Sequence, residues 1–385
     1  MTDPVRLLQD LIRCPSVTPR DAGCFDVVTQ ALAPLGFTAE RVTFTEAGTA
    51  DVDNLVIRHG SGGRHLGFAG HVDVVPPGPE ASWSHPPFAG ELSKGMVYGR
   101  GAADMKGAIA AFVAAAGDFV AGGAAAPGSI SLILTADEEG PAVNGTAKAM
   151  AWLKERKAVP DHCLVGEPTS VKQVGDTIKI GRRGSLRATI VVTGRQGHSA
   201  YPHLADNPIP KLVRLLDRLG RHQLDDGNEH FEPSHLSISS IDVGNPAGNV
   251  IPERATAQLG IRFNTLHTPQ SLGAWLQDEA RCVEAEMGGS VSLATEVGAL
   301  AFVSETGPFG ALVEQAAAEV TGLKPALSTG GGTSDARFIR NYCPVVECGS
   351  LSTTIHQVDE RIGVDELHTL TRIYRAVIER YFASP

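Results

Sequence analysis

Short apolar runs alternate with helix-like patterns along roughly the first 178 residues of the chain. Runs of four to eight branched or alternating apolar residues are typical of strands, and apolar residues spaced three and four apart are typical of helices. The pattern predicts strands near 53–58, 66–70, 129–135 and 163–166, and helices at 4–13, 24–35, 108–121 and 145–156. Such alternation predicts a parallel or mixed α/β sheet covered by helices.

The pattern changes after this region, where strands become longer and neighbouring strands follow each other. The expected elements are a strand at 186–193, a helix at 208–220, strands at 235–243 and 254–264, a helix at 270–287 and a strand at 290–295. This β-α-β-β-α-β order is the ferredoxin-like pattern. Helices near 307–321 and 364–382 then resume the first pattern. We therefore expect an α/β catalytic domain with a mixed sheet (1–179 and 295–385) and an inserted α+β ferredoxin-like dimerisation or lid domain (180–294).

Two adjacent glutamates, Glu138 and Glu139, follow the apolar run 129–135. A buried carboxylate must be paired, protonated or bound to a metal, and adjacent residues leaving a strand point in different directions. One carboxylate could therefore bind a cation while the other faces a water on that cation, which suits metal-assisted hydrolysis. Taken alone, the pair could also lie in a solvated loop.

Further potential ligands lie at the ends of short apolar strands or in turns near them. His71 ends such a run, and Asp73 lies on the same face of an extended segment, where its carboxylate could accept a hydrogen bond from the second ring nitrogen. Each residue taken alone could be a surface, core or helix-capping residue. Together they give five candidate ligands: His71, Asp104, Glu139, Glu167 and His356.

This set of side chains suits a pair of metal ions. One imidazole and one terminal carboxylate for each ion, with one bridging carboxylate, would serve two divalent cations ~3.5–4 Å apart. Nitrogen and carboxylate ligands without cysteine favour zinc, with cobalt or manganese as alternatives. In open α/β sheets such sites collect at one end of the strands.

Composition excludes several other classes of function. The 385 residues, 42% of them hydrophobic, can bury a sizeable core. The net charge of -10 does not favour a nucleic-acid partner. The six scattered cysteines have no paired C-x-x-C spacing and indicate thiols in a reducing compartment. The sequence has no signal-peptide pattern and no apolar run near ~18 residues, so we expect a cytoplasmic protein without a membrane partner.

Several strings give the chain a specific resemblance. HVDVVP (71–76), GRGAADMKG (99–107), TADEEG (135–140) and GEPT (166–169) resemble the zinc aminoacylase and carboxypeptidase superfamily. The strings at 181–186, 197–208, 249–252 and 331–339 resemble the members of that superfamily that remove succinyl groups. The resemblance covers nearly the whole chain. It implies hydrolysis of N-succinyl-LL-2,6-diaminopimelate to succinate and LL-2,6-diaminopimelate, in lysine and diaminopimelate biosynthesis, by a homodimer with two divalent ions.

The resemblance also implies a role for each site residue. Asp104 would bridge the two metals. His71 and Glu167 would complete one metal site, and Glu139 and His356 the other. Glu138 would be the general base, and Asp73 would support His71. His198, on the inserted domain, would reach the active site of the partner subunit and polarise the scissile carbonyl. The positions that resemble substrate contacts are Arg182, Asn249, Arg262, Thr333 and Ser334.

The chemistry of a small N-acyl amino acid substrate with carboxylates at both ends agrees with some of these positions. Such a substrate requires guanidinium groups, which Arg182, Arg183, Arg262 and Arg337 could supply unless they are surface charges. The glycines 330–332 with Thr333 and Ser334 could bind a carboxylate through backbone N–H groups, or could form an ordinary loop. His198 could likewise be a solvated loop histidine.

One position departs from the family pattern. Ser352 stands where the family often has asparagine, so recognition near the acyl group could differ. This leaves a related deacylase open, such as an acetylornithine deacetylase or a dipeptidase. A non-catalytic binding protein that kept the fold is a second alternative, against which the intact Glu138 and five ligand positions argue.

Overall fold

The structure is a computed structural model that describes residues 3–122, 128–304 and 307–383. The chain forms two compact units. The first unit comprises Met1–Ile180, Ser304–Ser328 and Ser334–Pro385, and the second comprises Gly181–Val303 and Thr329–Thr333. The catalytic and dimerising roles expected for the two parts of the chain remain predictions.

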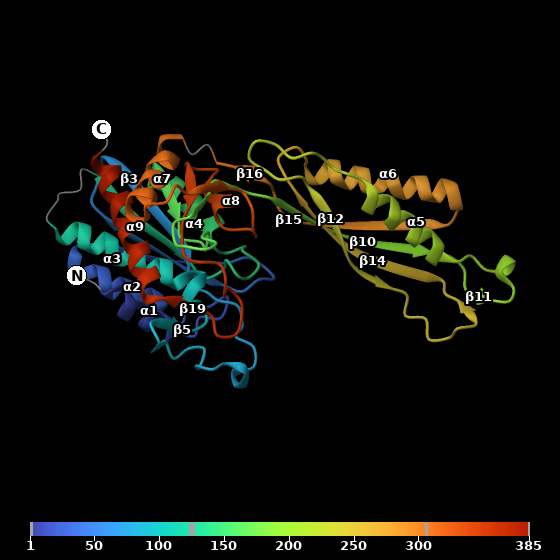
Figure 1. Cartoon of the computed structure of the whole chain (residues 1–385), viewed down its shortest axis with the longest axis horizontal. Coiled ribbons are helices and arrows are strands. Elements are labelled where there is room, and N and C mark those ends of the chain that lie inside the picture. Colours follow the sequence, from blue (N-terminus) through green and yellow to red (C-terminus); the bar gives the residue numbers. More distant parts are fainter. Residues whose placement is uncertain (1–2, 123–127, 305–306, 384–385) are drawn as a thin grey trace. The chain divides into compact units, whose positions relative to one another are not determined.

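An eight-stranded mixed sheet forms the centre of the first unit (Figure 1). Its strands, in spatial order, are β1 (Thr38–Phe44), β2 (Val52–His59), β6 (Gly128–Thr135), β3 (Arg64–His71), β7 (His162–Val165), β18 (Val345–Glu347), β8 (Thr177–Lys179) and β17 (Ala326–Ser328). Strands β6, β3, β7 and β18 are parallel neighbours, while β1, β2 and β8 add antiparallel pairs. The predicted mixed α/β sheet is therefore confirmed, although β1 and the three-residue strands were not expected.

Helices cover this sheet and supply most of the core. They are α1 (Pro4–Ile12), α2 (Cys24–Leu32), α3 (Gly107–Ala121), α4 (Thr146–Glu155), α7 (Gly307–Thr321), α8 (Ala336–Ile339) and α9 (Val364–Ala383). The alanine-rich helix α3 is buried along almost its whole length, and it contacts α1 and α9 (Figure 1). Phe112 of α3 stacks on Phe68 of β3 with ring centroids 4.2 Å apart. This ring contact packs α3 directly against β3.

A small three-stranded sheet joins two segments that lie far apart in the sequence. It consists of β4 (Glu91–Ser93), β5 (Met96–Tyr98) and β19 (Arg361–Gly363). Arg361 of β19 pairs with Tyr98 of β5, and the N–H of Gly99 donates to the carbonyl of Glu360 at 2.9 Å. The glycine-rich turn after β5 is therefore held beside the loop that precedes β19.

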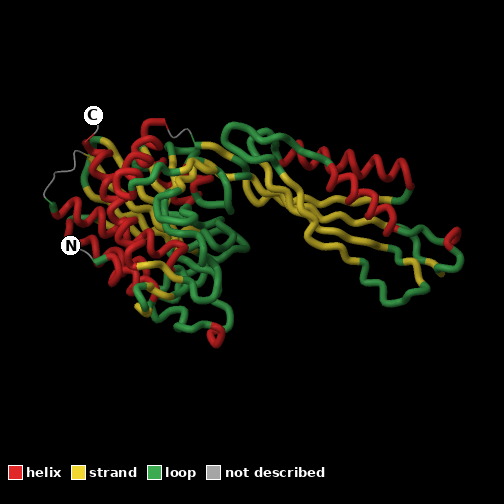
Figure 2. Tube along the Cα trace, in the orientation of Figure 1, coloured by secondary structure: helices red, strands yellow, loops and turns green. Residues whose placement is uncertain are grey.

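The second unit is a four-stranded antiparallel sheet with two helices on one face (Figure 2). The strands lie in the order β12 (His235–Asp242), β14 (Arg254–Phe263), β10 (Gly184–Thr193) and β15 (Ser290–Ala299), and the helices are α5 (Pro208–Arg221) and α6 (Pro269–Met287). Alternate residues of β10 are buried in the core shared with α5 and α6. The order confirms the predicted ferredoxin-like pattern. Short pairs complete the unit: β9 (Gly181–Arg182) with β16 (Phe302–Val303), and β11 (Gly197–His198) with β13 (Val250–Ile251).

Within the described ranges, no helix is both long and apolar enough to cross a membrane.

Candidate metal centre

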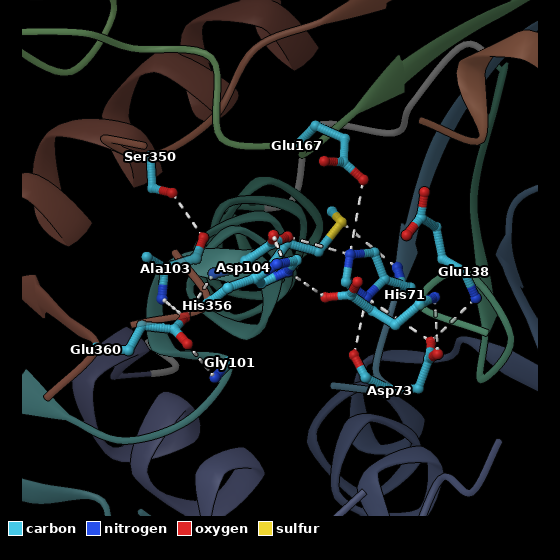
Figure 3. A network of polar contacts seen from close by, with 12 residues as sticks. His71, Asp73, Gly101, Ala103, Asp104, Glu138, Glu167, Ser350, His356 and Glu360 are labelled. Carbon is cyan, nitrogen blue, oxygen red and sulfur yellow. Dashed lines mark hydrogen bonds and ion pairs between the residues drawn. The ribbon is translucent and has the colours of Figure 1, made fainter. Parts of the chain in front are cut away.

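Three neighbouring parallel strands carry predicted ligands to one edge of the sheet. His71 is the last residue of β3 and pairs with Thr135, the last residue of β6. Glu138 and Glu139 lie in the loop after β6, and Glu167 lies in the loop after β7, which pairs with the other side of β3. Because parallel strands end at the same edge, these side chains converge. Asp104 and His356 join them from the turn before α3 and the loop before β19, so all five predicted ligands meet in the first unit. Figure 3 shows His71, Asp104, Glu167 and His356 of this set.

Asp104 lies between the two imidazoles. Its Oδ1 is 3.2 Å from Nε2 of His71, and its Oδ2 is 3.4 Å from Nε2 of His356. Nε2 of His71 also lies 3.6 Å from Oε1 of Glu167, and Nε2 of His356 lies 2.9 Å from Oε1 of Glu139. Each imidazole nitrogen therefore faces one terminal carboxylate and one oxygen of the shared aspartate. This is the arrangement that two adjacent cations with one bridging carboxylate require.

The protonation of the imidazoles shows how the site accommodates a cation. Burial alone would lower the pKa of His71, but the hydrogen bond and the charge of Asp104 outweigh it and raise the pKa well above its usual value. Hydrogen bonds with Asp104 and Glu139 raise the pKa of His356 to about 10. In turn, the two imidazoles outweigh burial and lower the pKa of Asp104. The negative charge that raises the pKa of both imidazoles is the environment that a cation requires, so the donor set fits divalent metal ions.

Glu138 differs from its neighbour Glu139 in its surroundings. Its carboxylate lies in a group with His71 and Glu167 whose ligand atoms are all within 4.8 Å of one another. Burial and then the charge of Glu167 raise the pKa of Glu138 well above its usual value. Burial and a neighbouring charge raise the pKa of a carboxyl group in the direction that suits a residue that exchanges protons during catalysis.

Asp73 supports both His71 and the Glu138–Glu139 segment. Nδ1 of His71 is 2.9 Å from the backbone carbonyl of Asp73, and 3.7 Å from its carboxylate. The carboxylate instead accepts the N–H groups of Glu138 at 3.3 Å and Glu139 at 3.0 Å. The sequence-based expectation that the carboxylate accepts from the imidazole is therefore replaced by a carbonyl contact. The reason is that the fully buried carboxylate finds two backbone donors in the loop after β6.

Sequence reasoning missed two buried carboxylates that hold the ligand loops. Asp137 accepts the N–H groups of Ala142 at 3.2 Å, Val143 at 2.9 Å and Asn144 at 2.9 Å, and so fixes the turn after Glu139. Its position next to the glutamate pair was the available signal. Glu360 holds the loop of Asp104, and no local pattern pointed to it.

The other predicted site residues lie in the second unit, except Ser334 and the candidate Arg337, which lie in the first. Arg182 is buried, and its Nη1 donates to the carbonyl of Gly332 at 3.1 Å. Arg262 of β14 has a pKa lowered by burial and by the neighbouring arginines. The backbone carbonyl of Asn249 accepts the N–H of Ser199 at 2.9 Å. Thr333 ends the short segment that belongs to the second unit. Their contacts with a substrate remain predictions.

Ser334 and His198 have well-defined local contacts. Ser334 is fully buried in the first unit, and its hydroxyl donates to Oε1 of Glu347 at 2.7 Å. His198 is exposed on β11 of the second unit, and its Nδ1 accepts the N–H of Ala200 at 3.0 Å. Because Nδ1 is an acceptor, the proton of the neutral ring is on Nε2, which is then free to donate.

The comparisons with known proteins are consistent with this site. Residues 67–380 match the family described as peptidase family M20/M25/M40. Succinyl-diaminopimelate desuccinylase from Parvibaculum lavamentivorans is 54% identical over 381 residues, which cover 99% of this chain and 96% of the relative. The enzyme of the same name from Rhodospirillum centenum is also 54% identical over 381 residues, with 99% and 98% covered.

Solved structures share the fold at low sequence identity. Aminopeptidase PepT from Bacillus cereus has a TM-score of 0.78 at 20% identity, with 99% of this chain and 98% of that chain covered. A protein from Bacillus subtilis described as a dinuclear metal-binding peptidase of the M20 family has a TM-score of 0.72 at 15% identity, with 99% and 98% covered.

Proposed function

The chain belongs to peptidase family M20/M25/M40, and we propose that it hydrolyses N-succinyl-LL-2,6-diaminopimelate to succinate and LL-2,6-diaminopimelate in lysine and diaminopimelate biosynthesis. The observation that carries the hydrolytic chemistry is the position of Asp104 between His71 and His356, with Glu138 beside them. The choice of a succinyl group and of diaminopimelate is inferred from relatives named succinyl-diaminopimelate desuccinylase, which are 54% identical over almost the whole chain.

The site would hold two divalent metal ions. Asp104 would bridge them, with His71 and Glu167 on one ion and Glu139 and His356 on the other. When bound, the two ions polarise the amide carbonyl and lower the pKa of the attacking water. We propose zinc on the nitrogen and carboxylate donors, with cobalt or manganese as alternatives.

Glu138 would move the proton during the reaction. It takes a proton from the attacking water and then delivers it to the leaving amine, so that the amide C–N bond breaks as the carboxylate of succinate forms. Two features support this role: its raised pKa and the hydrogen bond from its backbone to Asp73, which fixes its position. Glu139 would act as a ligand, because its carboxylate contacts His356.

We also propose a homodimer in which His198 acts on the partner's substrate. The edge strand β12 is exposed along almost its whole length, and its side chains Ile238 and Ile241 are exposed at 40% and 57%. An exposed edge strand can pair with the same edge of a second copy. The donor Nε2 of His198 would stabilise negative charge on the carbonyl oxygen of the substrate.

A substrate panel tests the proposed function. Purified, zinc-loaded protein should hydrolyse N-succinyl-LL-2,6-diaminopimelate faster than N-acetylornithine and dipeptides. Faster hydrolysis of N-acetylornithine or a dipeptide would assign a related deacylase activity instead. Absence of turnover on every substrate, with both metals bound, would indicate a binding protein that kept the fold.

A further inference from the structure

Glu360 is a fully buried carboxylate surrounded by donors from one loop (Figure 3). Its Oε1 accepts the N–H groups of Ala103 and Asp104, both at 3.0 Å. Its Oε2 accepts the N–H of Gly101 at 3.1 Å and Nη1 of Arg100 at 2.7 Å. Both oxygens are therefore satisfied, which a buried carboxylate requires.

The glycine-rich turn forms an anion-binding nest for this carboxylate. Gly101 has φ 85°, and a Cβ atom there would lie 2.6 Å from Cγ1 of Val74, so only glycine fits. This conformation points the N–H groups of Gly101, Ala103 and Asp104 toward Glu360. On the opposite side, the carbonyl of Ala103 accepts the hydroxyl of Ser350 at 2.7 Å. The backbone that carries Asp104 is therefore held from two sides.

Arg100 links the same carboxylate to the loop of His356. Its Nη1 donates to the carbonyl of Gln357 at 3.2 Å as well as to Glu360, and its Nη2 lies 3.4 Å from the carbonyl of His356. The buried pair Arg100–Glu360 thus contacts the backbones of both Asp104 and His356. These are the residues expected to provide the bridge and one terminal ligand of the proposed centre.

We infer that Glu360 and Arg100 are positioning residues that hold Asp104 and His356 at the separation required by the two metal ions. This inference rests on the proposed metal centre. Metal ligands must lie within about 0.2 Å of their bond lengths, and Asp104 must present both oxygens at once. The backbone of a turn fixed through three of its N–H groups cannot carry Asp104 away from the site without breaking bonds to a buried charge.

Glu360→Gln tests the inference because it keeps the shape of the side chain but changes its hydrogen bonding. The amide places an NH₂ donor against two existing donors, whichever way it is oriented. We expect the affinity for both metal ions to fall about 10–100-fold, as when other groups that orient metal ligands are lost. Arg100→Lys keeps the charge but loses the planar fork. It should weaken mainly the ion expected on His356, because the contacts of Arg100 with the carbonyls of His356 and Gln357 are lost. The turn of Asp104 still donates three N–H groups to Glu360.

Asp176→Asn is the matched control. Asp176 also accepts three backbone N–H groups, from Val171, Lys172 and Gln173, but its turn carries none of the predicted ligands. Each metal-free variant is first melted by circular dichroism to establish folding. It is then titrated with Co²⁺, with calorimetry for affinity and stoichiometry and visible absorption for coordination. The control should bind two ions as the wild type does.

The possible outcomes separate the inference from the proposed function. Wild-type affinity for both ions in folded Glu360→Gln overturns the inference, and so does an equal loss in Asp176→Asn. If Glu360→Gln does not fold, unchanged affinities in Arg100→Lys overturn it. A wild-type chain that binds fewer than two ions overturns the proposed metal centre and, with it, this inference.

Discussion

Replacing Glu138 and Glu139 separately by glutamine tests the division of labour in the site. The change is chemically identical at the two neighbouring positions, because each loses a negative charge and a proton acceptor while keeping its size. The backbone N–H groups of both residues donate to Asp73, and this contact does not depend on either side chain. Differences between the two variants therefore report the roles of the side chains.

The structure gives the direction and size of each effect. The Glu139 carboxylate lies 2.9 Å from His356, so Glu139→Gln should reduce metal affinity itself. Glu138 is grouped with His71 and Glu167, and both of these predicted ligands remain in its variant. Loss of a general base lowers kcat by about 10²–10⁴-fold, which corresponds to about 2.7–5.4 kcal/mol of activation free energy. Glu138→Gln should therefore bind two metals and substrate normally but turn over slowly.

The assay combines metal titration with initial rates of N-succinyl-LL-2,6-diaminopimelate hydrolysis at saturating metal. Near-normal kcat in Glu138→Gln would place the base elsewhere. Because Glu138 also lies close enough to His71 and Glu167 to be a ligand, a second outcome is informative. If Glu138→Gln lost metal affinity as strongly as Glu139→Gln, Glu138 would be a ligand and the assignment of the base would be refuted.

Three further predictions follow from the same geometry. A chelator should abolish activity and zinc should restore it, and Asp104→Ala should lose both metals together; full two-metal occupancy in Asp104→Ala would contradict the shared bridge. Mixing inactive His198→Ala with inactive Glu138→Gln should regenerate activity, because a mixed dimer contains one intact site; no recovery after proven subunit exchange would place His198 outside the partner's site. In the folded, metal-free protein the pKa of His356 is raised to about 10. The protonated imidazole therefore stabilises the fold fully below pH ~6.5, its ordinary pKa, and this contribution is lost as the pH rises toward 10. Because this side chain is 47% exposed, the free energy of unfolding should fall by only about 1 kcal/mol. Denaturant unfolding measures this fall, which should be absent in His356→Ala.

The sequence predicted the site residues best where a metal-ligating or acid–base side chain lies close after an apolar strand. β3, β6 and β7 were expected from their buried runs, and their ends supply His71, the glutamate pair and Glu167. Strand β1 was missed because its residues are mostly polar and exposed, so no apolar alternation marks it. Likewise β18 has only three residues, and its place in the sheet is set by pairing with β7.

Contacts between distant segments could not be predicted from local patterns. The spacing of Asp73 placed it beside His71, but it could not distinguish a contact with the carbonyl from one with the carboxylate. The role of Glu360 was still harder to predict from the sequence. Its contact with the turn of Asp104 depends on the pairing of β19 with β5 across more than 250 residues of sequence. A glutamate in a polar stretch before a strand has no signal that distinguishes it from a solvated residue.

The buried carboxylates explain how a centre rich in like charges can be assembled in a folded chain. Four carboxylates, those of Asp104, Glu138, Glu139 and Glu167, surround two imidazoles, so their mutual repulsion favours spreading the loops apart. Asp73 and Glu360 oppose this by accepting the backbone N–H groups of the ligand residues themselves. These bonds act on the backbone of the ligand loops and not on their side-chain carboxylates. These backbone bonds order the loops without the help of the side chains that would bind the cations. The geometry of the ligands and the charge of the metals are therefore separate requirements of the site.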